Sequence, residues 1–337
     1  MDYTKHKSTI LAIIGVGFIG YLYTKYNEKK YKDDNIENYK IIQNYLINSV
    51  TLDNKNKPIL WIHIPYKLNS RKWESFGSRN TYNLNEPYLQ LTVKTIIEKC
   101  KKSFYICLID DDSFRDILPE WNVDMSRISD PILSKLRITG MMKILYKYGG
   151  LFIPPTFVCL KNLKTFYDEG TNKKKPFCVE YISRNSSSSI VDYFPNTLSL
   201  GALKNDKTIQ KLIQYLEGLI SRDCTNESLF DGNVERQLFK LVQDKKMNML
   251  PANLIGAKTA DDKYITIEDM METNGLKITK NAYGVYIPHD EILHRKSYEW
   301  FANISHDEII NSELNICRVI QSSLPDVEES KEAVISM

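Results

Sequence analysis

At 337 residues the chain is longer than the usual single domain, and one α/β domain of catalytic size with appended segments is the economical interpretation. Its 45 basic and 42 acidic residues leave a formal charge of +3, too small a field to attract nucleic acid, so no nucleic-acid partner is expected. The six cysteines include no C-x-x-C pair and are too dilute for a disulfide scaffold, which indicates reduced thiols. Cys107 and Cys159 lie in apolar runs and are predicted to pack in the core.

The amino terminus carries an uncharged apolar run, residues 8–23, with lysines on both sides. As a helix it rises about 24 Å, short of the roughly 30 Å hydrocarbon core, so a crossing needs help from Tyr23, Tyr26 and snorkelling lysines. We predict a single-pass membrane anchor over residues 1–26; a cleaved signal peptide and a buried helix are the alternatives. Lysines are denser after the run than before it, which favours a main domain on the cytoplasmic side. Golgi-type transferases have the opposite orientation, so we leave open on which side of the membrane the main domain lies.

The rest of the chain divides by composition into three parts. Residues 27–56 are polar and Asn-rich, and we interpret them as a stem, with an opening helix of the domain around residues 41–46 as the alternative. Residues 57–305 are predicted to form the globular domain. Residues 306–337 are predicted to form a carboxyl-terminal helix followed by an acidic tail.

Short apolar runs alternate with a helical stripe at the start of the globular part. Residues 57–66 predict a buried strand closed by proline at both ends, residues 89–101 a helix, and residues 103–114 a strand that ends in an acidic turn. Strand, helix and strand at this spacing argue for a parallel α/β sheet, whose ligands bind outside the carboxyl ends of the strands.

The acidic turn places Asp110, Asp111 and Asp112 at such a strand end. Adjacent carboxylates repel one another unless they are solvated or neutralised, so these three are candidates for holding a divalent cation or facing the ribose of a nucleotide. The alternative is a solvated turn that caps the helix beginning at Ser113.

Residues 130–150 predict a well-bounded helix. Asp130 is the expected N-cap, with Pro131 at the first helical position, and apolar side chains then mark one face. Gly149 and Gly150 are expected to end the helix in a left-handed cap.

A strand over residues 151–153 follows, and here the sequence resembles a known family. The pattern Y-K-Y-G-G at residues 146–150, followed by apolar residues, is similar to the shared core of the capsular polysaccharide synthesis proteins and of related glycosyltransferases with a DXD sugar-binding motif. The strand containing Trp61, the acidic turn, and the strand and loop over residues 196–206 extend the resemblance, which covers residues 57–206.

The resemblance implies a GT-A-like nucleotide-diphospho-sugar transferase fold, with a mostly parallel central sheet flanked by helices. In that family the D-x-D carboxylates hold Mn²⁺ or Mg²⁺, which bridges the diphosphate of the sugar nucleotide. It implies a nucleotide-sugar partner and a glycan or lipid-linked acceptor. The candidate nucleotide-sugar residues are Trp61, Asp110, Asp111, Asp112, Arg137, Gly149, Gly150, Pro154 and Thr156.

The chain departs from the family pattern at its charged positions. Pro154 stands at the family's first aspartate and Thr156 at the second acidic position, while Ile138 and Met141 stand where the family has Asp and Arg. Proline offers neither a carboxylate nor an amide donor, so Pro154 cannot replace a metal ligand. Arg137, one turn before Met141, is a candidate substitute for the phosphate-facing arginine, or else a solvated helix residue.

Asp111, His289 and His294 are the candidate metal ligands. The two histidines are five residues apart, unlike the H-E-x-x-H zinc pattern, and residues 289–294 are interpreted as a surface turn. The resemblance keeps them as candidates, because a late histidine completes the metal shell of metal-dependent GT-A enzymes.

Two functions from different classes therefore stand. One is a membrane-anchored glycosyltransferase that moves a sugar from a nucleotide donor to a glycan or lipid-linked acceptor. The other is a catalytically inactive protein of the same fold that serves as a structural or interaction module at a membrane.

Overall fold

The computed structural model describes residues 57–64, 86–185, 188–189, 191–222 and 226–324. The chain divides into two units, Met1–Tyr45 and Leu46–Met337, and all the described residues belong to the second. The stem predicted for residues 27–56 and the acidic tail beyond Leu324 lie outside the described residues.

The described residues form a main sheet of six strands, in the order β2-β1-β3-β6-β5-β7, and a small sheet of β4 and β8. The strands are β1 Ile59–His63, β2 Tyr105–Ile109, β3 Gly150–Phe152, β4 Phe157–Cys159, β5 Phe177–Ile182, β6 Tyr193–Ala202, β7 Asn248–Leu250 and β8 Gly284–Tyr286.

Five of the six strands of the main sheet point the same way. β1 pairs in parallel with β2 and with β3, and β5 pairs in parallel with β7. β6 is antiparallel to both of its neighbours, β3 and β5, so β6 alone in this sheet runs in reverse. The carboxyl ends of the other five strands lie at one edge, which we call the carboxyl edge. The predicted α/β class with a mostly parallel sheet is confirmed.

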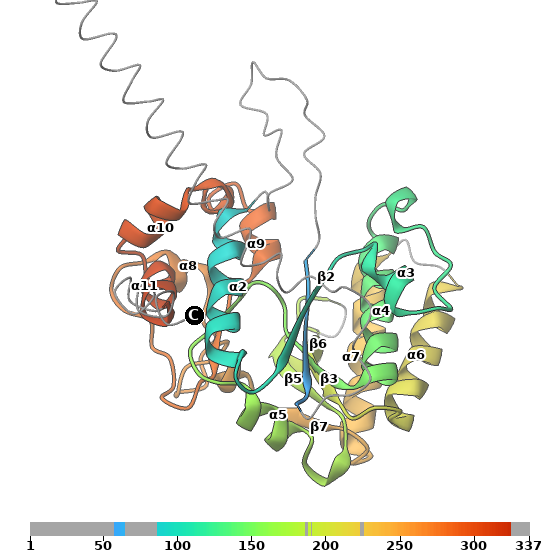
Figure 1. Cartoon of the computed structure of the whole chain (residues 1–337). Helices are drawn as coiled ribbons and strands as arrows, with labels where there is room; N and C mark the ends of the chain where they lie inside the picture. Colours follow the sequence, from blue (N-terminus) through green and yellow to red (C-terminus); the bar gives the residue numbers. More distant parts are fainter. Residues whose placement is uncertain (1–56, 65–85, 186–187, 190, 223–225, 325–337) are drawn as a thin grey trace, which may run out of the picture. The chain divides into compact units, whose positions relative to one another are not determined.

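Helices cover both faces of the main sheet (Figure 1). α4 packs against α6, and α7 packs against β6, on one face; α2 packs against the small sheet and against α10 and α11 on the other. The helices are α2 Pro87–Cys100, α3 Ser113–Ile117, α4 Ile132–Tyr148, α5 Lys164–Gly170, α6 Lys207–Ile220, α7 Glu227–Gln243, α8 Ile267–Met271, α9 His289–His294, α10 His306–Asn311 and α11 Asn315–Ser323.

The membrane anchor predicted for residues 1–26 is not supported. Among the described residues, no helix is long and apolar enough to cross a membrane. The 17-residue helices α4 and α7, for example, both contain several charged side chains. The apolar run at residues 8–23 lies outside the described residues, and the structure gives no support to a single-pass localisation.

Most elements predicted for residues 57–206 are present. β1, α2, β2, α4, β3 and β6 occupy the expected places, and α3 begins at Ser113. The N-cap prediction for α4 is wrong by one residue, because Pro131 is the cap and Asp130 Oδ1 instead accepts a hydrogen bond from the Ser134 amide at 3.2 Å. Cys107 and Cys159 are free and buried, as predicted.

Candidate functional site

The carboxyl edge gathers the ends of β1, β2 and β3 and the start of α4. His63 closes β1, and Asp111 follows β2 by two residues. Because α4 precedes β3, which runs toward this edge, the amino-terminal turns of α4 lie there, with Lys135 and Arg137. Parallel strands thus bring together residues that are far apart in the sequence, as the carboxyl ends of α/β sheets commonly do.

Arg137, Asp111 and His63 form a hydrogen-bonded cluster at this edge. Arg137 Nε donates to Asp111 Oδ1 at 2.8 Å, and Arg137 Nη2 donates to Asp111 Oδ2 at 2.5 Å. His63 Nε2 donates to Asp111 Oδ1 at 2.9 Å, and the imidazole stacks on Phe114 with ring centroids 5.4 Å apart. The solvated alternative for Arg137 is therefore wrong: its side chain is only 18% exposed and is held by a two-point ion pair.

This cluster fixes the charge of Asp111. Burial alone would raise its pKa, but the hydrogen bonds and charges of Arg137 and His63 hold the pKa of Asp111 well below its usual range. Both carboxylate oxygens accept hydrogen bonds from these two side chains. Together they occupy three of the roughly four lone-pair positions of the carboxylate, which leaves little room for a metal ion at Asp111.

The other two carboxylates of the acidic turn differ from Asp111. Asp110 Oδ1 accepts hydrogen bonds from the Ser113 amide at 2.9 Å and from the Ser113 hydroxyl at 2.6 Å, so Asp110 ties down the start of α3. Asp112 is exposed at the N-cap position and makes no side-chain cap hydrogen bond. Asp110 and Asp112 thus fit the alternative of a turn at the start of the helix, whereas Asp111 belongs to the cluster with Arg137 and His63.

Trp61 and the double glycine hold the core beneath the edge. Trp61 is fully buried, and its Nε1 donates to the Gly149 carbonyl at 2.9 Å. Gly149 and Gly150 have φ of +70° and +108°, and a Cβ on Gly150 would lie 2.3 Å from the Ile59 carbonyl oxygen. These three predicted site residues therefore have packing roles that explain them without a ligand.

Pro154 and Thr156 lie in the short turn between β3 and β4. The Pro154 carbonyl accepts from the Phe157 amide at 3.2 Å, and the Thr156 carbonyl accepts from the Ile287 amide at 3.1 Å. Thr156 is only 4% exposed. The turn joins the main sheet to the small sheet and provides no carboxylate.

The two candidate histidines lie on α9, which corrects the predicted surface turn. Two acidic residues in its first turn favour a helix there, and Ile292 anchors it in the core. His289 Nδ1 lies 2.6 Å from the Tyr88 hydroxyl and 3.2 Å from Glu86 Oε2, whereas His294 Nδ1 donates to the Asp290 carbonyl at 2.8 Å. Within the described residues, no group of three or more His, Cys, Asp and Glu side chains is arranged to hold a metal ion.

A second polar cluster, which the sequence did not single out, lies at the amino-terminal end of α7. This end is also at the carboxyl edge, because α7 precedes β7. Asp231 is exposed on one side, but the protein around its carboxyl removes enough water to raise its pKa to about 6; Glu227 adds to the rise and Lys135 opposes it. Lys135 is 1% exposed, and its Nζ lies 4.8 Å from the centre of the Phe230 ring. One turn after Asp231, Glu235 is buried, and burial raises its pKa as well.

Glu235 is held by the loop and strand opposite α7. Its Oε2 accepts from the Ser183 hydroxyl at 2.9 Å, and its Oε1 accepts from Asn196 Nδ2 at 3.3 Å. Sequence periodicity could not reveal this cluster, because its members come from α4, α7, β6 and the residues after β5, and none forms a local motif.

An ion pair joins the residues after β5 to α9. Arg184 Nη1 lies 2.5 Å from Glu291 Oε1, and Arg184 Nη2 donates to the Tyr264 hydroxyl at 2.6 Å. Tyr181 packs edge-on against both Tyr264 and Tyr286. This aromatic network connects the main sheet to the small sheet and its helix.

No protein-family model matches the chain, and no curated protein matches it. Solved structures do. The galactosyltransferase LgtC, solved in complex with donor and acceptor sugar analogs, has 12% identity and a TM-score of 0.39, covering 81% of this chain and 99% of that one. The PaToxG glycosyltransferase has 10% identity and a TM-score of 0.32, covering 56% and 71%.

A third similar structure is 4-diphosphocytidyl-2C-methyl-D-erythritol synthase from Anaerococcus prevotii, with 14% identity and a TM-score of 0.30, covering 63% of this chain and 94% of that one. The chain is thus similar, at low identity and with TM-scores below 0.5, to two solved glycosyltransferases. None of the structures named here is a capsular polysaccharide synthesis protein, and that finer assignment stays a prediction.

Proposed function

We propose that the protein is a glycosyltransferase that binds a nucleotide-sugar donor at the carboxyl edge and transfers the sugar to a glycan acceptor. The observation that carries this is the position of α4 between two clusters. From α4, Arg137 binds Asp111, which His63 also contacts. From the same helix, Lys135 lies over the Phe230 ring and near Asp231 on α7. Cations and carboxylates from both halves of the chain thus meet at the edge where α/β folds bind their ligands.

The donor half of the proposed site lies around Arg137. Its Nε and Nη2 are used by Asp111, which leaves Nη1 for a phosphate oxygen of the donor. At the start of α4 the Leu133 amide donates to the Ser129 carbonyl and the Ser134 amide donates to Asp130 Oδ1, so the donor half rests on the arginine. A guanidinium group held in place favours a phosphate oxygen.

The acceptor half of the proposed site lies around Asp231. A carboxyl with a pKa of about 6 is ionised at neutral pH, yet it is basic enough to accept a proton from a sugar hydroxyl during transfer. In the proposed reaction the acceptor oxygen forms a bond to the anomeric carbon. The bond from that carbon to the diphosphate breaks, the nucleoside diphosphate leaves with the electron pair, and Asp231 takes the hydroxyl proton.

The predicted Mn²⁺ or Mg²⁺ ion does not fit the described donor set. Hard cations of this kind prefer several oxygen ligands, usually with at least one carboxylate free to bind. Asp111 is bound by Arg137 and His63, Asp110 is bound by Ser113, and the turn at Pro154 and Thr156 offers no carboxylate. Asp112 is exposed and makes no side-chain cap hydrogen bond, but among the described residues no group of three or more His, Cys, Asp and Glu side chains is arranged to hold a metal ion. No reaction step is therefore assigned to a metal, and metal dependence stays a prediction, tested by measuring donor binding with and without the cations.

The same observations support a second candidate function, a protein that keeps the fold without catalysis. Pro154 removes the family's metal ligand, and Arg137 neutralises the central aspartate of the acidic turn. In this alternative the Arg137–Asp111 pair only stabilises the edge, and the chain acts as an interaction module.

The deciding experiment uses the full chain and a panel of UDP-glucose, UDP-galactose, UDP-N-acetylglucosamine and GDP-mannose. Calorimetry measures donor binding with Mn²⁺, with Mg²⁺ and with EDTA, and release of nucleoside diphosphate measures turnover. Asp231→Asn is compared with Asp244→Asn, an exposed aspartate at the other end of α7. Arg137→Gln is compared with Arg127→Gln, whose side chain is 84% exposed.

We expect at least one donor to bind, Arg137→Gln to weaken its binding about tenfold, and Asp231→Asn to lower turnover at least about a hundredfold with little change in donor affinity. Both control variants should behave as the unmodified chain. Donor binding without turnover would favour the second candidate function. A chain that binds no donor under any metal condition would refute the transferase proposal.

A further inference from the structure

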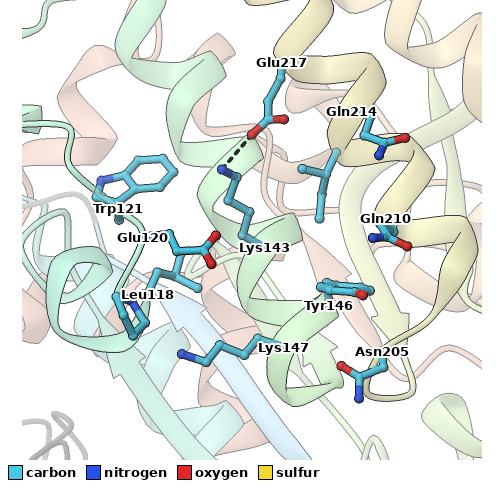
Figure 2. Close-up of a pocket in the computed structure, with 12 residues that line it drawn as sticks. Leu118, Glu120, Trp121, Lys143, Tyr146, Lys147, Asn205, Gln210, Gln214 and Glu217 are labelled. Atoms are coloured by element: carbon cyan, nitrogen blue, oxygen red, sulfur yellow. Dashed lines mark ion pairs between the residues drawn. The ribbon is translucent and has the colours of Figure 1, made fainter.

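A groove of about 440 Å³ lies on the helical face of the unit, separate from the carboxyl-edge clusters. Figure 2 shows α4 between its two walls, with Lys143, Tyr146 and Lys147 on its outer surface. One wall is the loop over residues 118–121 and the other is α6. The volume lies within the roughly 300–1,000 Å³ typical of small-ligand sites.

The polar side of the groove is rich in amides. Gln210 and Gln214 are exposed and lie one turn apart on α6, and Asn205 precedes the helix. Asn205 has φ of +61°, a left-handed conformation that is strained for most residues, and its backbone amide donates to the Tyr146 carbonyl at 2.7 Å, which leaves the side-chain amide out of this contact. Each of these side chains offers both donors and an acceptor, the combination that hydroxyl groups match.

The charges in the groove are already balanced. Its lining contains two lysines and two glutamates, and Lys143 Nζ lies 2.6 Å from Glu217 Oε1. Lys147 Nζ donates to the Ile117 carbonyl at 3.1 Å, which also ties α4 to the segment before the loop. The lining therefore has no excess charge of either sign to select a charged ligand.

The opposite wall is apolar. Apart from the exposed Glu120, it is lined by Leu118, Pro119 and Trp121, and a hydrogen bond of 2.8 Å from the Trp121 backbone amide to the Leu118 carbonyl closes the turn. The Trp121 ring packs on Phe114 with centroids 5.3 Å apart, so the wall is fixed from behind. A ligand with hydroxyls on one side and C–H surface on the other matches the two walls.

The groove also has a direction. β6 runs away from the carboxyl edge, so α6, which follows it, starts at the far edge and runs back. Asn205 and Gln210 therefore lie toward the far edge, and Glu217 lies nearer the carboxyl edge. A chain-like ligand lying along α6 would lead toward the proposed site.

We infer that this groove binds an uncharged oligosaccharide and holds part of a polymeric acceptor away from the reaction centre. The inference rests on the proposed function for its biological meaning, but glycan binding can be measured without any donor. An extended peptide is disfavoured, because peptides commonly add to a free strand edge or bury an apolar helix face. The groove is made by side chains of two helices and a loop, with amides on one wall.

The test measures binding of neutral hexasaccharides of glucose, galactose, mannose and N-acetylglucosamine to the full chain, without nucleotide sugar. Saturation-transfer NMR detects binding and calorimetry gives the dissociation constant. The double variant Gln210→Ala/Gln214→Ala removes exposed side chains only, and Gln214→Trp fills the groove. The matched control is Gln243→Ala, an exposed glutamine at the end of α7. Circular dichroism and melting temperature verify that each variant is folded.

We expect at least one hexasaccharide to bind, the double variant to weaken it at least about fivefold, and Gln214→Trp to abolish it. Gln243→Ala should leave it unchanged, and because the assay contains no nucleotide sugar, the groove can be confirmed even if the transferase proposal fails. If no hexasaccharide binds, or if the α6 variants leave the dissociation constant unchanged, the inference is wrong. It is also wrong if acidic oligosaccharides or peptides bind more tightly in a way that the α6 variants abolish.

Discussion

Arg137 donates two hydrogen bonds to Asp111, from Nε to Oδ1 at 2.8 Å and from Nη2 to Oδ2 at 2.5 Å, although the two residues are on different elements. The side chains are 18% and 23% exposed, so the pair is largely shielded from water. Two-point pairs of this kind are stronger and more directional than surface ion pairs.

Removing the arginine should therefore destabilise the fold. Arg137→Met leaves Asp111 charged and only partly compensated by His63, and we expect a loss of about 2 kcal/mol in the free energy of unfolding. Urea unfolding at pH 7 measures it. Arg127→Met is the control, because the exposed Arg127–Asp124 pair should contribute less than about 0.5 kcal/mol. The double variant Arg137→Met/Asp111→Asn should recover part of the loss; equal losses in the two single arginine variants would contradict a structural role for the pair.

Gly150 should be intolerant of any side chain. With φ of +108° and the Ile59 carbonyl oxygen 2.3 Å from the place that a Cβ would occupy, Gly150→Ala combines backbone strain with a clash against β1. We expect a loss of at least about 3 kcal/mol or failure to fold. Gly218→Ala is the matched control, because a Cβ on this helical glycine of α6 would have nothing within 4 Å, and alanine there should stabilise by roughly 0.5–1 kcal/mol. Thermal unfolding of both variants decides, and a well-tolerated Gly150→Ala would refute the packing explanation.

The sequence predicts the framework better than the site. Local signals in the sequence predict five elements close to where the structure has them: β1, α2, β2, α4 and β3. These signals are the periodicity of apolar residues and the positions of proline and glycine. The glycine pair suggests part of a ligand site when only the sequence is considered, yet its geometry is explained by contact with Ile59 and Trp61. Such contacts depend on strand pairing, which no local pattern reports.

The polar contacts of the carboxyl edge show the same limit. Asp111 and Arg137 are both candidates from the sequence, but only the fold shows that they bind each other and that His63 joins them. Asp231 and Lys135 belong to no motif, and the fold brings them near each other where the Lys135 side chain lies over the Phe230 ring. The helix at His289–His294 escapes prediction because six residues are too few for a periodic signal.

Donor binding should not require a divalent cation. Since Asp111 is bound by Arg137 and His63, we expect the dissociation constant of the bound nucleotide sugar to change less than about threefold between EDTA and Mn²⁺. Calorimetry in the two buffers measures this. A requirement for Mn²⁺ that Asp111→Asn abolishes would instead establish Asp111 as a metal ligand and restore the sequence-based expectation.

Asp231 should make stability fall as the pH rises through weakly acidic values. Its pKa is raised from 3.8 to about 6, so between these values the folded chain holds a proton that the unfolded chain has released. Stability from this group is thus present below about pH 4 and is lost as the pH rises through about 6. Asp231→Asn removes the titration and should gain stability relative to the unmodified chain as the pH rises from 4 to 7. The expected gain is about 1 kcal/mol, kept small because solvent screens the exposed residue.

Urea unfolding of both proteins at pH 4, 5, 6 and 7 measures this gain in the free energy of unfolding, with Asp244→Asn as the control. A difference that stays flat over this range, or that reverses in sign, would show that Asp231 is not held in the environment proposed for an acceptor-facing carboxyl.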